Sequence, residues 1–365
     1  MRDNFRFILA LLFCLLVASS APAQGGPRFE IVVPAAAHSA AITGRVYVII
    51  SPVKKDTLLD TFGAWDLQGP FYGQDVEHVA PGTPMVIDGE SPGYPVESLK
   101  NFPAGDYYVQ GLVNLYTEFH RADGHTLWLH MDQWEGQGFN ISPGNLYSDV
   151  QLVHLDPAKG YTIRLQASHV IPPVVVPPDT QWVKRIRIKS ELLSKFWGRP
   201  MYIGATILLP ADYDEHPQQN YPVVYLQGHF SLSSPFGIQK DPPPLSPGAG
   251  VGDRETYEAS VAWASPHFPR MIAVTFQHPT PYYDDSYAVN SPNDGPYGDA
   301  LFEELIPYLE SHFRMIREPW ARVLTGGSTG GWESMALMLY HPSFFDGTYS
   351  GYPDQLDFRH YQLVN

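Results

Sequence analysis

The chain has 365 residues, with 23 Lys and Arg residues against 38 Asp and Glu residues, so its formal net charge at pH 7 is −15. A surface this acidic repels polyanions, and no basic run with interleaved aromatic residues interrupts it, which argues against nucleic acid as a partner. The single cysteine, Cys14, excludes a disulfide framework. A chain of this length exceeds one comfortable hydrophobic core, so we expect two domains.

The first residues have the pattern of a secretory signal peptide. Arg2 and Arg6 flank a short polar start, an unbroken apolar run follows at 7–17, and Ala21-Pro22-Ala23 supplies small residues suited to cleavage. The run is shorter than the roughly 20 residues of a transmembrane helix, and no later segment approaches that length. We therefore expect residues 1–23 to be removed and the mature protein to be secreted or periplasmic, without a membrane span.

Residues 24–171 have the alternating pattern of an antiparallel β-sandwich. Runs such as 106–119 place apolar residues at alternate positions, and Gly, Pro and Asp punctuate these runs at short intervals. The aromatic side chains, Tyr116 and Trp128 among them, suit either core packing, which we expect, or a platform for stacking sugars. Four prolines at 172–180 then favour an extended spacer over a helix or a central strand.

Residues 181–365 change to strands interleaved with helices, which is the pattern of an α/β fold. Apolar, β-branched runs at 221–227 and 271–277 are typical of parallel strands buried on both faces. The ranges expected to be strands are 184–190, 202–210, 221–227, 271–277, 323–324 and 344–352, and those expected to be crossover helices are 254–264 and 299–313. The predicted fold class is an α/β-hydrolase-type sheet preceded by an all-β sandwich.

The segment around Ser328 carries the clearest chemical signal. Gly326, Ser328 and Gly330 form a G-x-S-x-G pattern between an apolar strand and a helix, a turn that exposes a serine hydroxyl above a sheet. The glycines are needed because the backbone there approaches its neighbours too closely for a Cβ atom. As a nucleophile, Ser328 would find an oxyanion donor in its own turn, because the backbone N–H of Thr329 lies at a helix N-terminus.

Two features of the following helix bear on this interpretation. Apolar residues recur at helical spacing, so we expect them to form its buried face; they are Trp332, Met335, Ala336, Leu339 and Tyr340. A phosphate-binding loop is disfavoured because Trp332 and Glu333 stand where Lys and Ser or Thr would be required. A glycine-rich turn without chemistry remains the alternative to a nucleophile.

Three segments, 205–230, 298–315 and 324–352, resemble the putative esterase family of the α/β-hydrolase superfamily, which includes esterase D and enterochelin esterase-like proteins. The resemblance implies hydrolysis of carboxylic esters by a Ser-His-acid triad without a metal or other cofactor. It also implies a second oxyanion donor on the loop after the 221–227 strand. Gln227-Gly228 stands there for the His-Gly of the family, and His229 occupies the donor position through its backbone N–H.

The triad partners of Ser328 are harder to find. In this fold the acid and then the histidine follow the serine along the chain, and only 37 residues follow Ser328. Asp354, just after the last expected strand, is the candidate acid, and His360 is the candidate base. A base must come within about 3 Å of the serine hydroxyl, and no further strand and helix follow to deliver His360. We therefore expect a C-terminally truncated chain whose true acid and base lie beyond Asn365.

The sequence thus predicts a serine hydrolase that cleaves a small-molecule or glycan-linked ester through an acyl-enzyme on Ser328. A peptidase or acyltransferase of the same fold is one alternative, because the shape of the pocket selects the leaving group. A glycan-binding protein with an inert hydrolase half is the other. No metal site is predicted.

Overall fold

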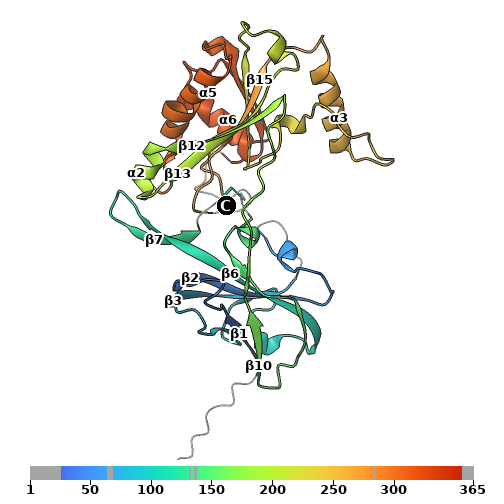
Figure 1. The fold of residues 1–365 in the computed structure, drawn as a ribbon, viewed down its shortest axis with the longest axis vertical. Helices are drawn as coiled ribbons and strands as arrows, with labels where there is room; N and C mark the ends of the chain where they lie inside the picture. Colours follow the sequence, from blue (N-terminus) through green and yellow to red (C-terminus); the bar gives the residue numbers. More distant parts are fainter. Residues whose placement is uncertain (1–25, 64–68, 131–132, 135–137, 283, 356–365) are drawn as a thin grey trace, which may run out of the picture.

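The computed structural model describes residues 26–63, 69–130, 133–134, 138–282 and 284–355. An all-β half, blue to green in Figure 1, precedes an α/β half, yellow-green to red, and this confirms the predicted fold class. The expected signal peptide at 1–23 and the candidate base His360 lie outside the described residues. None of the helices in the described ranges has the length and apolarity needed to cross a bilayer.

The all-β half contains two packed sheets. One has the strand order β10-β1-β4, and the other follows the path β11-β8-β6-β2-β3-β5, with β7 and β9 also paired to β6. Pairing is antiparallel, as expected, except between β1 and β10, which run parallel. The strands are β1 (Pro27–Val32), β2 (Ile42–Ser51), β3 (Phe71–Val79), β4 (Met85–Ile87), β5 (Gly93–Tyr94), β6 (Gly105–His120), β7 (Thr126–His130), β8 (Leu146–Tyr147), β9 (Gln151–Leu155), β10 (Tyr161–Gln166) and β11 (His169–Val170).

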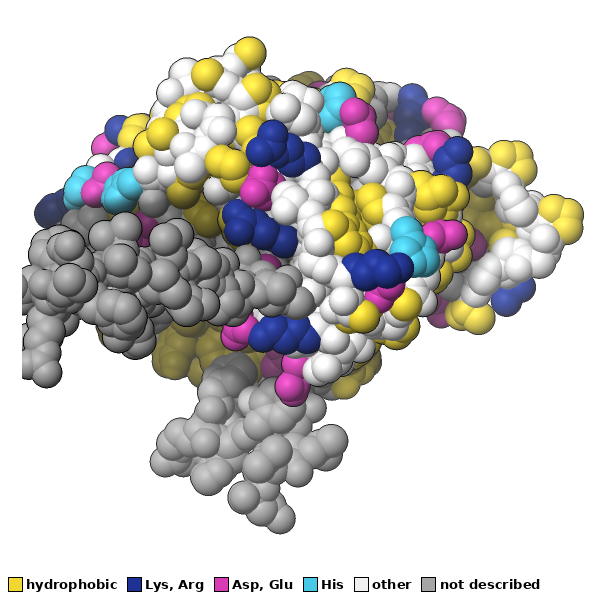
Figure 2. Space-filling model, turned by 90° about the horizontal axis from the view of Figure 1, so that it is seen from below, with side chains coloured by type: hydrophobic (Ala, Val, Ile, Leu, Met, Phe, Trp, Pro, Cys, Tyr) yellow, Lys and Arg dark blue, Asp and Glu magenta, His cyan; other side chains and the backbone are white. Residues whose placement is uncertain are grey.

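Alternation along these strands builds the core of the all-β half. Side chains such as Ile31 from β1, Val48 from β2 and Val113 from β6 are completely buried in one cluster between the sheets. On the face seen from below in Figure 2, dark blue Lys and Arg side chains lie next to magenta Asp and Glu side chains. In the same half, Arg164 of β10 pairs with Glu30 of β1 at 3.0 Å.

The hairpin of β6 and β7 reaches from the all-β half to the α/β half. Phe119 near the end of β6 packs edge-on against Trp197, with ring centroids 5.2 Å apart. The N–H of Ala122 in the turn donates to the carbonyl of Phe196 at 2.7 Å. The two halves are therefore in contact through this hairpin, while residues 172–180 contain no helix or strand.

The α/β half is organised around one six-stranded sheet with the order β12-β13-β15-β14-β18-β19. Its first two pairings are antiparallel and the other three are parallel. The strands are β12 (Val183–Ser190), β13 (Met201–Leu208), β14 (Val223–Gln227), β15 (Ile272–Gln277), β18 (Arg322–Gly327) and β19 (Gly347–Gly351), with a separate two-stranded ribbon of β16 (Asn290–Ser291) and β17 (Gly295–Pro296). Each expected strand is present, with its bounds shifted by a few residues.

Helices cover both faces of this sheet (Figure 1). They are α2 (Glu191–Trp197), α3 (Val251–Ala264), α4 (Tyr297–Asp299), the π-helical η6 (Ala300–Leu305), α5 (Ile306–His312) and α6 (Thr329–Tyr340). Short 3-10 helices are η1 (Leu59–Thr61), η2 (Leu99–Asn101), η3 (Phe139–Ile141), η4 (Tyr213–Glu215), η5 (Pro235–Gly237) and η7 (Pro319–Ala321). Trp263 of α3 packs with Val224 on one face, whereas Leu309 of α5 and Leu337 of α6 join the cluster on the other.

The expected buried face of α6 is partly wrong. Leu339 and Tyr340 are 69% and 67% exposed, whereas Glu333, Ser334 and Leu337 are buried. The cause lies in the first turn, where Gly330 and Gly331 pack against neighbouring backbone and so decide which side of the helix faces the sheet. Because an α-helix has 3.6 residues per turn, Ser334 and Leu337 lie on the same side as these glycines.

Candidate active site

Ser328 lies at the turn between β18 and α6, in the strand–turn–helix context that its motif requires. Its backbone has φ 54° and ψ −123°, a conformation that residues with a Cβ atom rarely adopt. Such backbone costs on the order of 1–3 kcal/mol and persists where the surrounding structure enforces it, most often at functional sites. The turn is thus strained at the residue whose hydroxyl it exposes.

The two glycines of the motif, Gly326 and Gly330, hold the turn in this strained conformation. A Cβ atom added to Gly326 would lie 2.3 Å from the carbonyl oxygen of Gly330, and one added to Gly330 would lie 2.1 Å from the carbonyl oxygen of Gln227. Neither contact can be relieved by rotating a side chain, because each partner is a backbone atom. The turn therefore packs directly on the end of β14.

The loop after β14 lies beside the serine turn. β14 and β18 are parallel neighbours with Gln227 opposite Gly326, so both loops leave the same edge of the sheet. Thr329 begins α6, and its N–H is one of the helix donors without an intrahelical acceptor. On the β14 loop, the N–H of Phe230 already donates to Asp285 Oδ2 at 2.9 Å. The two expected oxyanion donors, Thr329 and His229, thus belong to adjacent loops.

Asp354 contacts the candidate nucleophile directly. Its Oδ1 accepts a hydrogen bond from the hydroxyl of Ser328 at 3.1 Å, and its Oδ2 accepts from the hydroxyls of Thr329 at 2.7 Å and Tyr287 at 3.1 Å. Its backbone N–H also donates to the carbonyl of Ser328 at 3.1 Å. In a Ser-His-acid triad the acid instead orients the histidine. The carboxylate here orients the serine and its turn.

Sequence comparison bears on the same segment. Residues 198–354, which include the β14 loop, Ser328 and Asp354, match the family described as Putative esterase. The matched residues make up most of the α/β half of the chain. This agrees with the resemblance inferred from the residues around Ser328.

Several solved structures are similar to this chain over about half of its length. A ferulic acid esterase is 20% identical over 47% of this chain and 59% of that chain, with a TM-score of 0.33. An S-formylglutathione hydrolase from Agrobacterium tumefaciens is 18% identical over 47% and 58%, with a TM-score of 0.32. An IroE-like serine hydrolase from Shewanella oneidensis is 19% identical over 46% and 49%, with a TM-score of 0.28. No curated protein sequence matches the chain.

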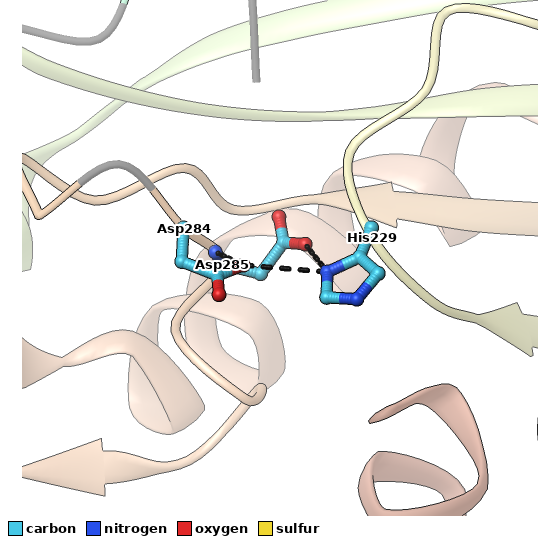
Figure 3. Close-up of side chains that lie close together, drawn as sticks. All are labelled: His229, Asp284 and Asp285. Carbon is cyan, nitrogen blue, oxygen red and sulfur yellow. Dashed lines mark hydrogen bonds and ion pairs between the residues drawn. The ribbon is translucent and has the colours of Figure 1, made fainter. Parts of the chain in front are cut away.

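The β14 loop is held by a charged cluster. Figure 3 shows the imidazole of His229 directed at two carboxylates from the loop after β15. Its Nδ1 lies 3.3 Å from Asp284 Oδ1 and 3.4 Å from Asp285 Oδ2. The hydrogen bonds to Asp284 and Asp285 raise the pKa of His229 to about 10, so the ring is an imidazolium at neutral pH.

Two further ionisable groups are buried behind this cluster. Glu333, one turn after Ser328 on α6, is completely buried, and burial raises its pKa well above the usual range. His278, at the end of β15, is 1% exposed, and burial lowers its pKa. Its Nε2 lies 3.9 Å from Glu333 Oε1, and its Nδ1 accepts from the N–H of Ser286 at 3.2 Å. Burial therefore favours the neutral form of both groups.

The charged cluster is also the place to consider a metal. One ligand-type atom each from His229, Asp284 and Asp285 lies within 4.8 Å of the others. Metal binding requires a neutral imidazole, whereas the raised pKa of His229 keeps a proton on the ring. The protonated ring of His229 is thus one cation that these two carboxylates can hold.

The candidate residues that the structure describes lie in two neighbouring places. Ser328, Thr329 and Asp354 come together at the serine turn, and His229 lies on the adjacent loop. The sequence argument missed the roles of Asp284, Asp285, His278 and Glu333. The only signal in the sequence was the acidic pair Asp284-Asp285 in the segment after the expected 271–277 strand. His229, the partner of this pair, lies 55 residues before Asp284 and 56 residues before Asp285 in the sequence.

Proposed function

We propose that the chain is an exported serine hydrolase that cleaves carboxylic esters through an acyl-enzyme on Ser328. The observation that carries this proposal is the left-handed backbone of Ser328 at the end of β18, with a glycine contact on either side. A phosphate-binding or purely structural turn would not need a serine in a strained conformation. Export rests on the signal-peptide pattern of residues 1–23.

In the proposed reaction, the Ser328 oxygen attacks the ester carbonyl carbon and its proton passes to a general base. The carbonyl oxygen becomes an oxyanion, which the backbone N–H groups of Thr329 and His229 stabilise. The protonated base then gives its proton to the leaving alkoxide, and an alcohol departs. Water, deprotonated by the same base, then attacks the acyl-serine; the acyl–Oγ bond breaks, the base returns its proton to Ser328 Oγ, and the carboxylic acid departs.

Two residues have further roles in this proposal. Asp354 holds the Ser328 hydroxyl in one rotamer through the 3.1 Å hydrogen bond to its Oδ1. The general base in this proposal is a histidine, and His360 is its candidate in this sequence. A carboxylate alone is a weak base for a serine hydroxyl, so Asp354 does not replace this histidine.

A fluorophosphonate probe on the full-length protein tests the assignment of the nucleophile. The probe phosphorylates an activated serine, and peptide mass spectrometry then locates the adduct. We expect the adduct on Ser328, no labelling of Ser328→Ala, and loss of p-nitrophenyl acetate hydrolysis by several orders of magnitude in the same variant. An adduct on another residue, or wild-type hydrolysis by Ser328→Ala, would contradict the proposal.

The all-β half supports a second candidate function, which is sugar binding. A cavity of about 280 Å³ is lined by Tyr116 and Trp128, by the carboxylates of Asp75 and Glu77, and by His78. His78 has φ 50° and lies where two residues of β3 oppose Thr43 of β2, a β-bulge that directs its ring to the edge of Trp128 at 5.5 Å. Aromatic faces stack on the apolar side of a sugar ring, and carboxylates accept hydrogen bonds from its hydroxyls.

Tryptophan fluorescence of the full-length protein, titrated with xylo- and cello-oligosaccharides, tests this second function. We expect saturable quenching that Trp128→Ala abolishes and that Trp320→Ala retains, since Trp320 lies in the α/β half and is 63% exposed. Equal quenching of the wild type and Trp128→Ala, or none at millimolar sugar, would rule it out.

A further inference from the structure

The oxyanion loop, residues 227–230, is fixed from two sides. At its start, Gly330 of the serine turn packs against the peptide between Gln227 and Gly228 so closely that an added Cβ would meet both residues. At its end, Asp285 Oδ2 faces two groups of the loop, the N–H of Phe230 at 2.9 Å and Nδ1 of His229 at 3.4 Å. The backbone N–H of His229 lies between these two attachment points.

The carboxylates that hold this loop are themselves immobilised. Asp285 has a side chain that is only 2% exposed, and it pairs with Pro279 across a short antiparallel bridge. The carbonyl of Asp284 accepts from both the N–H and the hydroxyl of Thr280 at 2.9 Å. The N–H of Asp285 donates to Asp284 Oδ1 at 2.7 Å. Asp284 and Asp285 therefore present a fixed pair of negative charges to the loop.

We propose that the side chain of His229 is a positioning residue, whose ion pairs with Asp284 and Asp285 hold the backbone N–H of the same residue where the oxyanion forms. This inference rests on the proposed ester hydrolase function. The inference adds to that function a requirement for the His229 side chain, because a backbone donor by itself imposes no condition on the side chain. An uncharged side chain at position 229 supplies the same N–H but not the cation that the two carboxylates hold.

The expected size of the effect follows from the sensitivity of oxyanion holes to geometry. Removing one preorganised donor costs about 10²–10³ in kcat, and a misplacement of about 1 Å costs roughly 10²-fold. The substrate carbonyl binds before the negative charge develops, so substrate binding should depend little on this donor. Loss of the His229 side chain should therefore lower kcat and leave KM nearly unchanged.

The experiment measures kcat and KM of the full-length protein with p-nitrophenyl acetate. For His229→Ala we expect kcat to fall about 10²-fold with KM within about twofold of wild type. His229→Asn restores a neutral donor near the Nδ1 position, so its kcat should recover part of the loss. Asp284→Asn removes one of the two charges and should lower kcat severalfold. The control is His154→Gln, which breaks an exposed pair with Asp106 at 2.7 Å in the all-β half and should behave as wild type.

The outcomes separate this inference from the function on which it rests. A wild-type kcat in His229→Ala, with Ser328→Ala inactive, overturns the positioning role and leaves the ester hydrolase standing. A raised KM with unchanged kcat also overturns it, because the side chain would then bind substrate. Wild-type activity in Ser328→Ala overturns both. If His229→Ala does not fold, wild-type kcat values in both His229→Asn and Asp284→Asn overturn the inference.

Discussion

The serine turn and the oxyanion loop lie side by side at one edge of the sheet, but they are held in different ways. The turn is held by backbone packing, since added Cβ atoms at Gly326 and Gly330 would meet carbonyl oxygens at 2.3 and 2.1 Å. The loop is held largely by charge, through His229 and the carboxylates of Asp284 and Asp285. One half of the proposed site therefore depends on steric fit, and the other on protonation states.

This difference determines how each region should respond to change. Backbone packing is insensitive to pH, and a single methyl group is enough to disrupt it. An ion-paired loop tolerates small changes of shape but responds to any group that alters the local charge. Substitutions in the serine turn should therefore have effects that do not depend on pH, whereas substitutions near the oxyanion loop should have effects that do.

Gly330→Ala should have the largest effect on stability, because it disrupts the backbone packing that holds the serine turn. Its Cβ would lie 2.1 Å from the carbonyl oxygen of Gln227 and 2.9 Å from the nitrogen of Gly228. We expect a loss of roughly 3 kcal/mol or more of unfolding free energy, with the loss unchanged between pH 5 and 8. Denaturant unfolding at the two pH values measures it.

The matched control is Gly347→Ala in β19, where an added Cβ would meet nothing within 4 Å. Its unfolding free energy should stay within about 0.5 kcal/mol of wild type. Equal stability of the two variants would show that the serine turn can relax. It would contradict the claim that backbone packing holds the turn.

Glu333→Gln, which changes a buried group beside the charged cluster, should have a smaller effect on stability. That effect should depend on pH. Burial raises the pKa of Glu333 in the folded protein, so the folded state keeps a proton that the unfolded chain releases above about pH 4.3. Wild-type stability is thus fully present below that pH and falls as pH rises toward the folded-state pKa. Glutamine is neutral throughout, so the variant should gain relative to wild type as pH rises.

Thermal melts at pH 5 and pH 8 measure this gain. We expect the Tm of Glu333→Gln to exceed that of wild type by about 2–4 °C at pH 8, equivalent to about 1 kcal/mol, and by less at pH 5. Glu303→Gln, which changes an exposed glutamate of η6, should shift neither value. A Tm difference that is the same at both pH values would mean that Glu333 is not held neutral by its surroundings.

The same contrast explains what the sequence could reveal. Steric requirements leave a local trace, because only glycine fits at Gly326 and Gly330, so the motif predicted the turn from five consecutive residues. Charge pairing across the fold leaves none: His229 and Asp285 become neighbours only once β14 and β15 pair in the sheet. Family resemblance predicted the backbone N–H of His229 as an oxyanion donor, but it gave no role to the side chain of this residue.

The elements of the fold also differ in how well the sequence predicted them. Buried β-branched runs predicted β14 and β15 to within two residues at their starts. The helix α2, in contrast, was not predicted, because its seven residues are too few to show a period. Its N-cap, Ser190, accepts from the N–H of Leu193 at 3.1 Å, and Gly198 ends it with φ 68°. Leu193 and Trp197 are then buried in the core of the α/β half, so tertiary packing stabilises this short helix.

The central claim is that Ser328 attacks and that Thr329 and His229 hold the resulting oxyanion. A crystal structure of the full-length protein carrying a covalent phosphonate tests it most directly. The account predicts phosphorus bonded to Ser328 Oγ and one phosphonyl oxygen within 2.7–3.1 Å of the backbone nitrogens of Thr329 and His229, with the His229 ring still between Asp284 and Asp285. A phosphonyl oxygen directed away from both nitrogens, or phosphorus bonded to another residue, would contradict it.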